Sequence, residues 1–194
     1  MDVDNNKPFF RCLSGGRLRK VILAVMFAFF GETQLSIAQS IQEGCYHRDY
    51  SDNHLRTHPD QVVDWITMRV GADDWGNQTV SMVVNSANQG HAKRSGLGGQ
   101  EFNQWLICFS DDATDACAVE CDGGSFKVTK QTSDAITFRT SYLLVGDNEE
   151  QCGGALDLAE FPNTPVSYRL DLVTDSACDG LGFLEPIRPA ETRE

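Results

Sequence analysis

Apolar and polar residues alternate along several short stretches of the chain. In 166–173, VSYRLDLV, every second residue from Val166 to Leu172 is apolar, and the residues between them are polar. The stretch 135–145, AITFRTSYLLV, places Ile136, Phe138, Tyr142 and Leu144 on one side. Because successive side chains of an extended strand point to opposite faces, this period of two predicts half-buried antiparallel strands.

Five further stretches complete the predicted set of strands: 62–70, 79–85, 102–110, 117–121 and 126–130. Turn-forming residues separate them, such as Asp122-Gly123-Gly124, which can supply the positive φ of a tight hairpin. After residue 39, no stretch of ten or more residues has the apolar spacing of a helix. We therefore expect a mainly β domain, an antiparallel meander of about seven or eight strands that forms a small barrel or a sandwich.

The first 38 residues have the organisation of an export signal. A basic stretch precedes the apolar run VILAVMFAFF (21–30), and Ser36 and Ala38 form a small-x-small cleavage site. The run is too short for the ~20 residues of a membrane-spanning helix. We expect four segments: a signal over 1–38, a polar lead-in over 39–61 with a short helical turn near 52–58, a β domain over 62–178 and a flexible tail over 179–194.

The charge of the expected mature chain is strongly negative. Without residues 1–38, the chain keeps 11 of its 16 Lys and Arg and 25 of its 28 Asp and Glu, a formal charge of −14. Phosphate binding needs a basic surface, so this balance argues against a nucleic-acid partner. It also disfavours adsorption to an anionic membrane face.

Six cysteines remain after the signal: Cys45, Cys108, Cys117, Cys121, Cys152 and Cys178. An even number in an exported chain indicates up to three disulfides, and a zinc site is disfavoured because paired C-x-x-C motifs are absent. If 116–121 is extended, Cys117 and Cys121 lie ~13 Å apart, beyond the ~7 Å that a disulfide tolerates. We expect Cys45 to pair with Cys178, and Cys108 with Cys117 or Cys121.

The segment 47–60, HRDYSDNHLRTHPD, contains three of the chain's four histidines. A helical turn capped by Asp52 would place His54 and His58 on one face, and His47 could approach them, which makes these three histidines candidate metal ligands. The alternative is a polar lead-in whose helical turn stops before Pro59. We favour the lead-in, because a group of histidines without a motif is weak support for a metal site.

Two loops and a set of aromatic residues are the other candidates for binding. The loop 86–100 carries His91, Lys93 and Arg94, which could cover an anionic ligand, and the loop 146–165 is acidic. A small barrel can hold one ligand. Five aromatic residues could line its interior or could simply form the core: Trp65, Trp75, Phe102, Trp105 and Phe109.

Motifs of catalysis and of cofactor binding are missing from the sequence. It contains no G-x-S-x-G, no H-E-x-x-H and no Walker loop, and GLGG (96–99) lacks the strand-to-helix setting of a phosphate cradle. We therefore expect a protein that is not an enzyme and that carries no cofactor.

Three segments, CYHRDYSDNHLRTHPDQVV (45–63), CAVECDGGSF (117–126) and YRLDLV (168–173), resemble those of small exported bacterial β proteins that contain cysteines and have no known function. The resemblance implies a periplasmic or secreted protein with a β fold, and it implies no activity or ligand. The sequence as a whole predicts a disulfide-stabilised binding or structural module of the cell envelope. Its partner would be an envelope protein or a small ligand, and a small-ligand carrier and a metal-binding protein are the alternatives.

Overall fold

The computed structural model describes residues 41–111, 114–146 and 154–181. The predicted export signal lies outside the described residues, as do Cys152 and most of the predicted tail. The strands are β1 (Gly44–Asp49), β2 (Val63–Ala72), β3 (Gln78–Ser86), β4 (Glu101–Asp111), β5 (Thr114–Ala118), β6 (Gly124–Gln131), β7 (Ala135–Val145), β8 (Leu156–Asp157) and β9 (Val166–Val173). The helices are α1 (Asp52–Thr57), α2 (Gly90–Arg94) and the 3-10 helix η1 (Asp175–Cys178).

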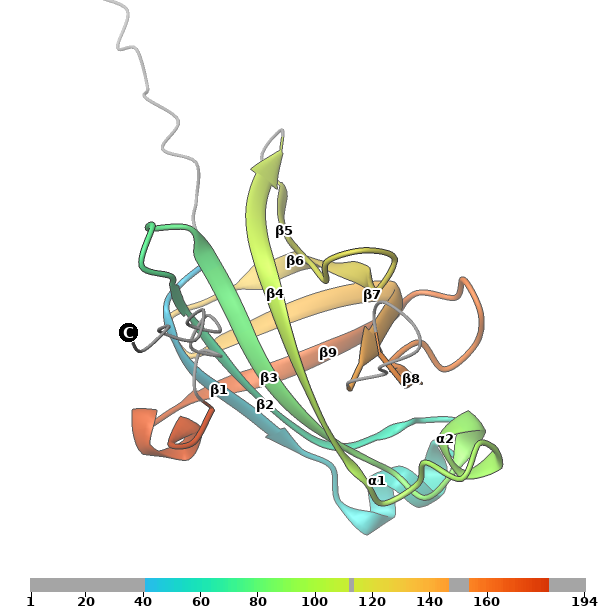
Figure 1. The fold of residues 1–194 in the computed structure, drawn as a ribbon. Coiled ribbons are helices and arrows are strands. Elements are labelled where there is room, and N and C mark those ends of the chain that lie inside the picture. Colours follow the sequence, from blue (N-terminus) through green and yellow to red (C-terminus); the bar gives the residue numbers. More distant parts are fainter. Residues whose placement is uncertain (1–40, 112–113, 147–153, 182–194) are drawn as a thin grey trace, which may run out of the picture. The chain divides into compact units, whose positions relative to one another are not determined.

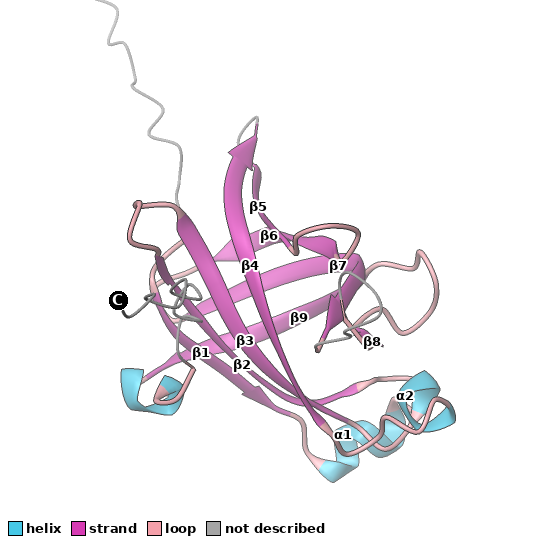
Figure 2. Cartoon of the chain, viewed as in Figure 1, coloured by secondary structure: helices cyan, strands magenta, loops and turns pink. Residues whose placement is uncertain are grey.

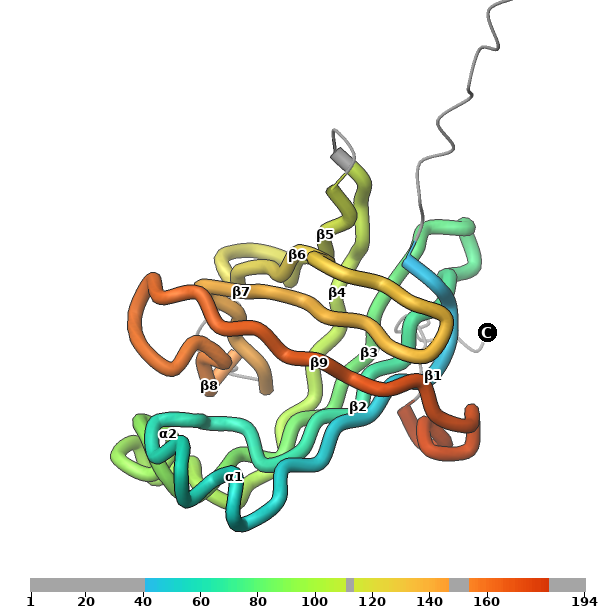
Figure 3. Tube along the Cα trace, turned by 180° about the vertical axis from the view of Figure 1, so that it is seen from behind, coloured from blue at the N-terminus to red at the C-terminus, as the bar shows by residue number. Residues whose placement is uncertain are grey.

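Eight of these strands close into an antiparallel barrel (Figure 1). The strands β1 to β6 pair in chain order, after which β6 pairs with β7, β7 with β9, and β9 with β1. Seen from behind, β6, β7 and β9 lie side by side and complete the wall next to β1 (Figure 3). The short β8 adds to the end of β7. The prediction of a mainly β meander is confirmed, and the structure is a barrel instead of a sandwich.

Alternation along each strand determines which side chains enter the barrel. Tyr46, Met68 and Met82 pair directly across β1, β2 and β3, and all three are buried. Because directly paired residues of neighbouring strands point to the same face, this row marks the inner side of the wall. The residues next to them along each strand point to the outer face, and His47 and Thr67 form one such outward-facing pair.

Aromatic rings fill part of the interior. Phe138 lies between Phe126 and Tyr168, with ring centroids 4.6 and 5.4 Å away, and none of the three is more than 1% exposed. These separations are typical of aromatic pairs in protein cores. The Tyr168 hydroxyl donates a hydrogen bond of 2.7 Å to the Leu158 carbonyl, so its one polar atom is satisfied. The inside of the barrel is therefore a packed core in this region.

The segment Ile41–Glu43 connects two walls at one end of the barrel. Ile41 is 2% exposed, and its N–H and carbonyl both bond the side chain of Gln78 on β3, at 3.1 and 2.6 Å. The next N–H, that of Gln42, donates to the side chain of Gln131 on β6 at 2.9 Å. This tethering keeps the apolar Ile41 side chain against the core.

The helices α1 and α2 lie together beyond the opposite end of the strands (Figure 2). The Gln89 side chain donates to the carbonyls of His58 and Gln61, at 2.7 and 3.1 Å, and ties the two helices together. Ala92 on α2 is fully buried. The predicted loop 86–100 thus contains a short helix that is fixed against the barrel. Within the described ranges, no helix has the length and apolar character that a membrane crossing needs.

The predicted helical turn near 52–58 is confirmed as α1, with one correction. The N-cap is Ser51 instead of Asp52, and its hydroxyl accepts a hydrogen bond from the His54 N–H at 3.3 Å. The helix ends at Thr57, just before His58 and Pro59, as the restriction imposed by proline requires.

The structure also contains strands that the alternation does not predict. The polar lead-in holds β1, a full strand of the barrel, because Tyr46 points inward and Cys45 is covered by η1. The predicted strand 117–121 is shifted toward the N-terminus: β5 covers Thr114–Ala118. Cys121 lies in the following turn, with φ 60°.

Two disulfides fasten the described residues. Cys45 on β1 bonds Cys178 of η1, and Cys108 on β4 bonds Cys117 on β5, directly opposite. Both pairings agree with the predictions, including the exclusion of a bond between Cys117 and Cys121. Cys121 is disulfide-bonded as well. The barrel is therefore clamped at its closing seam and across one hairpin.

Burial of tyrosine makes the fold sensitive to high pH. Desolvation raises the pKa of Tyr168 well above its ordinary value of 10.0, and burial also raises the pKa of Tyr46 and of Tyr50. The folded protein thus holds these phenolic protons more tightly than the unfolded chain does. This contribution to stability is fully present below the unfolded pKa and is lost as the pH rises above it.

We expect the free energy of unfolding, measured with urea, to fall between pH 8 and pH 10.5. Tyr168→Phe should reduce this fall, because it removes one of the raised phenols. At pH 8 the same variant should be less stable by about 1 kcal/mol, the usual value of a lost hydrogen bond. An unchanged pH dependence in Tyr168→Phe would show that Tyr168 does not contribute to it.

Candidate functional site

A groove runs along the outer face of β1 and β2. Its volume is about 410 Å³, within the range of small-ligand sites. The residues that line it come from β1, β2, the end of β9 and η1: His47, Asp49, Trp65, Thr67, Val173 and Ala177. The groove lies outside the barrel, since these positions alternate with the inward-facing ones.

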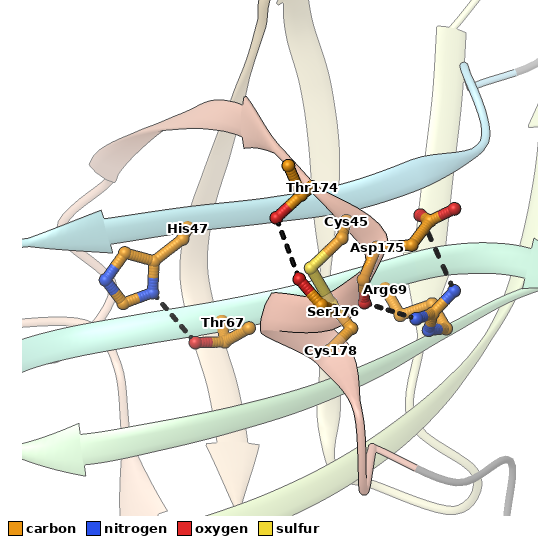
Figure 4. The surroundings of a disulfide bond; sticks show 8 residues. All are labelled: Cys45, His47, Thr67, Arg69, Thr174, Asp175, Ser176 and Cys178. Atoms are coloured by element: carbon orange, nitrogen blue, oxygen red, sulfur yellow. Dashed lines mark hydrogen bonds and ion pairs between the residues drawn. A yellow bond between two sulfur atoms is a disulfide. The ribbon is translucent and has the colours of Figure 1, made fainter.

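The register of β1 and β2 brings four of these side chains together. His47 pairs directly with Thr67, and Asp49 pairs with Trp65. The His47 Nδ1 and the Thr67 Oγ1 are 2.9 Å apart (Figure 4). The imidazole and the indole have centroids 6.4 Å apart and planes inclined at 37°. The four side chains form one patch, and the indole ring of Trp65 within it is half-buried.

The other wall of the groove is held by the Cys45–Cys178 disulfide. η1 lies over β1 and β2, and Figure 4 shows its contacts with both strands. The Arg69 guanidinium on β2 donates to the Asp175 carbonyl at 3.0 Å and lies 3.9 Å from the Asp175 carboxylate. The disulfide and Arg69 thus fix η1, and with it Ala177, at a set distance from the strand wall.

A carboxylate, that of Asp49, lines one end of the groove. Asp49 is exposed at the end of β1. Burial raises the pKa of the neighbouring Asp64, and the nearby charges of Asp49 and Asp52 raise it further. Such a field favours neutral or cationic ligands over anions.

The candidate metal ligands are divided between two places. His54 on α1 and His58, the C-cap of that helix, stack with ring centroids 4.0 Å apart, as their spacing predicts. The His54 Nε2 lies 2.8 Å from the Gln61 side chain, and the His58 Nδ1 lies 2.9 Å from the His54 carbonyl. His47 lies in the groove. Over the described residues, no group of three or more His, Cys, Asp or Glu side chains could hold a metal ion.

The three candidate residues of the loop 86–100 lie on α2. The His91 Nε2 is 3.0 Å from the Ala159 carbonyl, which joins α2 to the segment after β8. Lys93 and Arg94 are exposed. The histidine therefore helps to fix the end of the barrel, and the two cations face solvent.

The five aromatic residues considered for an internal pocket are spread over the molecule. Phe102 is 7% exposed and belongs to the core, whereas Trp75 and Phe109 are 77% and 51% exposed. Trp65 lines the outer groove, and Trp105 is half-buried. The aromatic rings that fill the interior are instead those of Tyr46, Phe126, Phe138 and Tyr168.

The contact between His47 and Thr67 is the nearest approach to a nucleophile–base pair in the groove. Nucleophilic catalysis requires a hydroxyl that a substrate can reach. Thr67 is only 7% exposed and its hydroxyl is directed at the imidazole. The pair therefore orients His47, whose other ring nitrogen, Nε2, is the one left to meet a ligand.

Comparison with protein-family models, with curated proteins and with solved structures gives no match to this chain. The geometry of the groove is therefore the basis for assigning a function.

Proposed function

We propose that the protein is an exported, non-enzymatic binding module of the cell envelope, and that it binds through the groove on the outer face of β1 and β2. The observation that carries this proposal is the packed aromatic core formed by Phe126, Phe138 and Tyr168 inside the barrel. A barrel with a packed interior serves as a rigid scaffold, and it binds a partner or ligand on its outer surface.

The cysteine pairing supports an exported protein. Disulfides persist in oxidising compartments and are rare in the cytosol. The N-terminal sequence agrees with this, because a basic stretch, an apolar run and the Ser36-x-Ala38 site have the order of an export signal. Export also explains why the seam between β1 and η1 is closed by a covalent bond.

The alternative of a small-ligand carrier requires room inside the barrel. The core positions that would face such a ligand are large: Tyr46, Tyr168, Phe126, Phe138, Met68 and Met82 are all at most 1% exposed. The segments at both ends also pack against this core, with Ile41 on one side and Ala92 on the other. These features favour surface binding over an internal ligand.

A photo-crosslinking amino acid placed in the groove tests the proposal. We would introduce benzoylphenylalanine at Ala177, on the groove wall, and at Ala155, an exposed alanine next to β8, as the matched control. Irradiation of cells that produce the full chain should give a defined adduct from position 177 and none from position 155. Adducts of equal yield from both positions, or no adduct from position 177, would contradict binding through the groove.

A further inference from the structure

We infer that the groove binds one ring of a neutral saccharide, an inference that rests on the proposed function of this surface. The pairing of β1 with β2 displays His47, Asp49, Trp65 and Thr67 as a rectangle. Its sides are about 5 Å across the strands and about 7 Å along them. One pyranose ring covers such a rectangle, with its edge hydroxyls over the polar corners and its flat side over Trp65.

The tryptophan supplies the apolar half of the recognition. One side of a pyranose ring carries mainly C–H groups, whose hydrogens are slightly positive, and the face of an indole is slightly negative. Trp65 is half-buried, so the ring is held in place while part of its surface remains open to the groove. Val173 and Ala177, which also line the groove, are small and apolar.

The polar side chains match the hydroxyl groups of a saccharide. The Asp49 carboxylate can only accept hydrogen bonds, and it lies on the same outer face as His47, two residues along β1. His47 lines the groove, and because its Nδ1 contacts Thr67, the Nε2 is the ring nitrogen left for a ligand. A sugar hydroxyl both donates and accepts, so it pairs with the carboxylate and with either form of the Nε2. A few polar groups in a mainly apolar site are typical of small-ligand recognition.

Charge separates this ligand class from the others. Asp49, the carboxylate in the lining of the groove, repels an anion. A cation would gain from Asp49 and from the face of Trp65, since cations bind aromatic rings. However, the site offers a single ring beside an imidazole, whereas a neutral ring uses Trp65, Asp49 and the His47 Nε2 together. The cationic ligand is therefore an outcome of the test.

Saturation-transfer NMR on the oxidised full chain tests the inference. The probes are trisaccharides of glucose, N-acetylglucosamine, mannose and galactose, with tetramethylammonium as the cationic probe. At least one trisaccharide should bind and receive the most saturation on the C–H groups of one ring. Trp65→Ala should weaken binding about tenfold or more, as the loss of a central tryptophan does in binding sites, and Trp65→Phe should retain part of it. Trp75→Ala, in an exposed turn, is the matched control and should bind like the parent protein.

Asp49→Asn separates the two ligand classes. It should leave saccharide binding within about threefold, because the amide still forms hydrogen bonds, and it should abolish the binding of a cation. Binding of tetramethylammonium alone, or saccharide binding that survives Trp65→Ala, would overturn the inference. If no trisaccharide binds but the adduct at position 177 still forms, the groove takes another ligand and the proposed function stands. If both fail, both proposals fall.

Discussion

Replacing Cys45 and Cys178 together by alanine is expected to lower the free energy of unfolding by about 5 kcal/mol. The bond links residues that are 133 positions apart, so its loss frees a very long loop in the unfolded chain. It also joins β1 to η1, next to the seam at which β9 closes the barrel. Equilibrium unfolding in guanidinium chloride, with the remaining cysteines oxidised, measures the change.

The matched control is the double alanine variant of Cys108 and Cys117. These residues are 9 positions apart on adjacent strands, so the chain-entropy argument gives a smaller loss of about 2.5 kcal/mol. Both variants remove one disulfide and leave no unpaired partner. An equal loss from the two variants, or a larger one from the hairpin pair, would contradict the role of the Cys45–Cys178 bond as the principal clamp.

Truncation of Phe138 to alanine is expected to cost about 3–5 kcal/mol, the usual range for a buried phenylalanine. Phe138 is fully buried between Phe126 and Tyr168. Its removal leaves a cavity that the closed wall of strands cannot collapse to fill. Urea denaturation monitored by tryptophan fluorescence gives the free energy of unfolding of the variant.

Phe109→Ala serves as the control for this experiment. Phe109 is 51% exposed on β4, so its truncation should change the free energy of unfolding by about 0.5 kcal/mol or less. A loss below about 1 kcal/mol in Phe138→Ala would mean that the interior is loosely filled. That result would weaken the argument for surface binding and would favour an internal ligand.

The strands were the part of the fold most open to prediction. The strands β9 and β7 coincide in their bounds with the predicted stretches 166–173 and 135–145, and β9 alternates as expected. Along β7, burial passes from Ile136 and Phe138 to Leu143 and Val145, so the expectation that Tyr142 shares the face of Phe138 is wrong: Tyr142 is 43% exposed. The sequence did not distinguish a barrel from a sandwich. That difference depends on the pairing of β9 with β1, which are joined by no local signal in the chain.

β1 was missed because tertiary packing determines its pattern. In the sequence Gly44–Asp49 only Tyr46 is a large apolar residue pointing inward, while Cys45 is buried on the outside by its disulfide with η1. α2 was missed for a similar reason: its five residues include one buried side chain, Ala92, and too few apolar positions to show a period.

The groove could be predicted only in fragments. The sequence makes His47 a candidate metal ligand and Trp65 a candidate residue of an internal pocket or of the core, and the structure places both on the same outer face. The face to which each residue points follows from the register of β1 with β2, and the second wall follows from the position of η1. Neither relation can be read from residue spacing along the chain.

We expect the native protein to be oxidised, with a disulfide that holds η1 beside the outer groove. Mass spectrometry measures this directly, on peptides from non-reduced protein whose free thiols are blocked at cell lysis. The protein should be recovered from the fractions outside the cytoplasm, with one peptide pair joining Cys45 to Cys178 and another joining Cys108 to Cys117. Blocked, unpaired Cys45 and Cys178 in the recovered protein would contradict the account, because the wall of the groove would then have no covalent support.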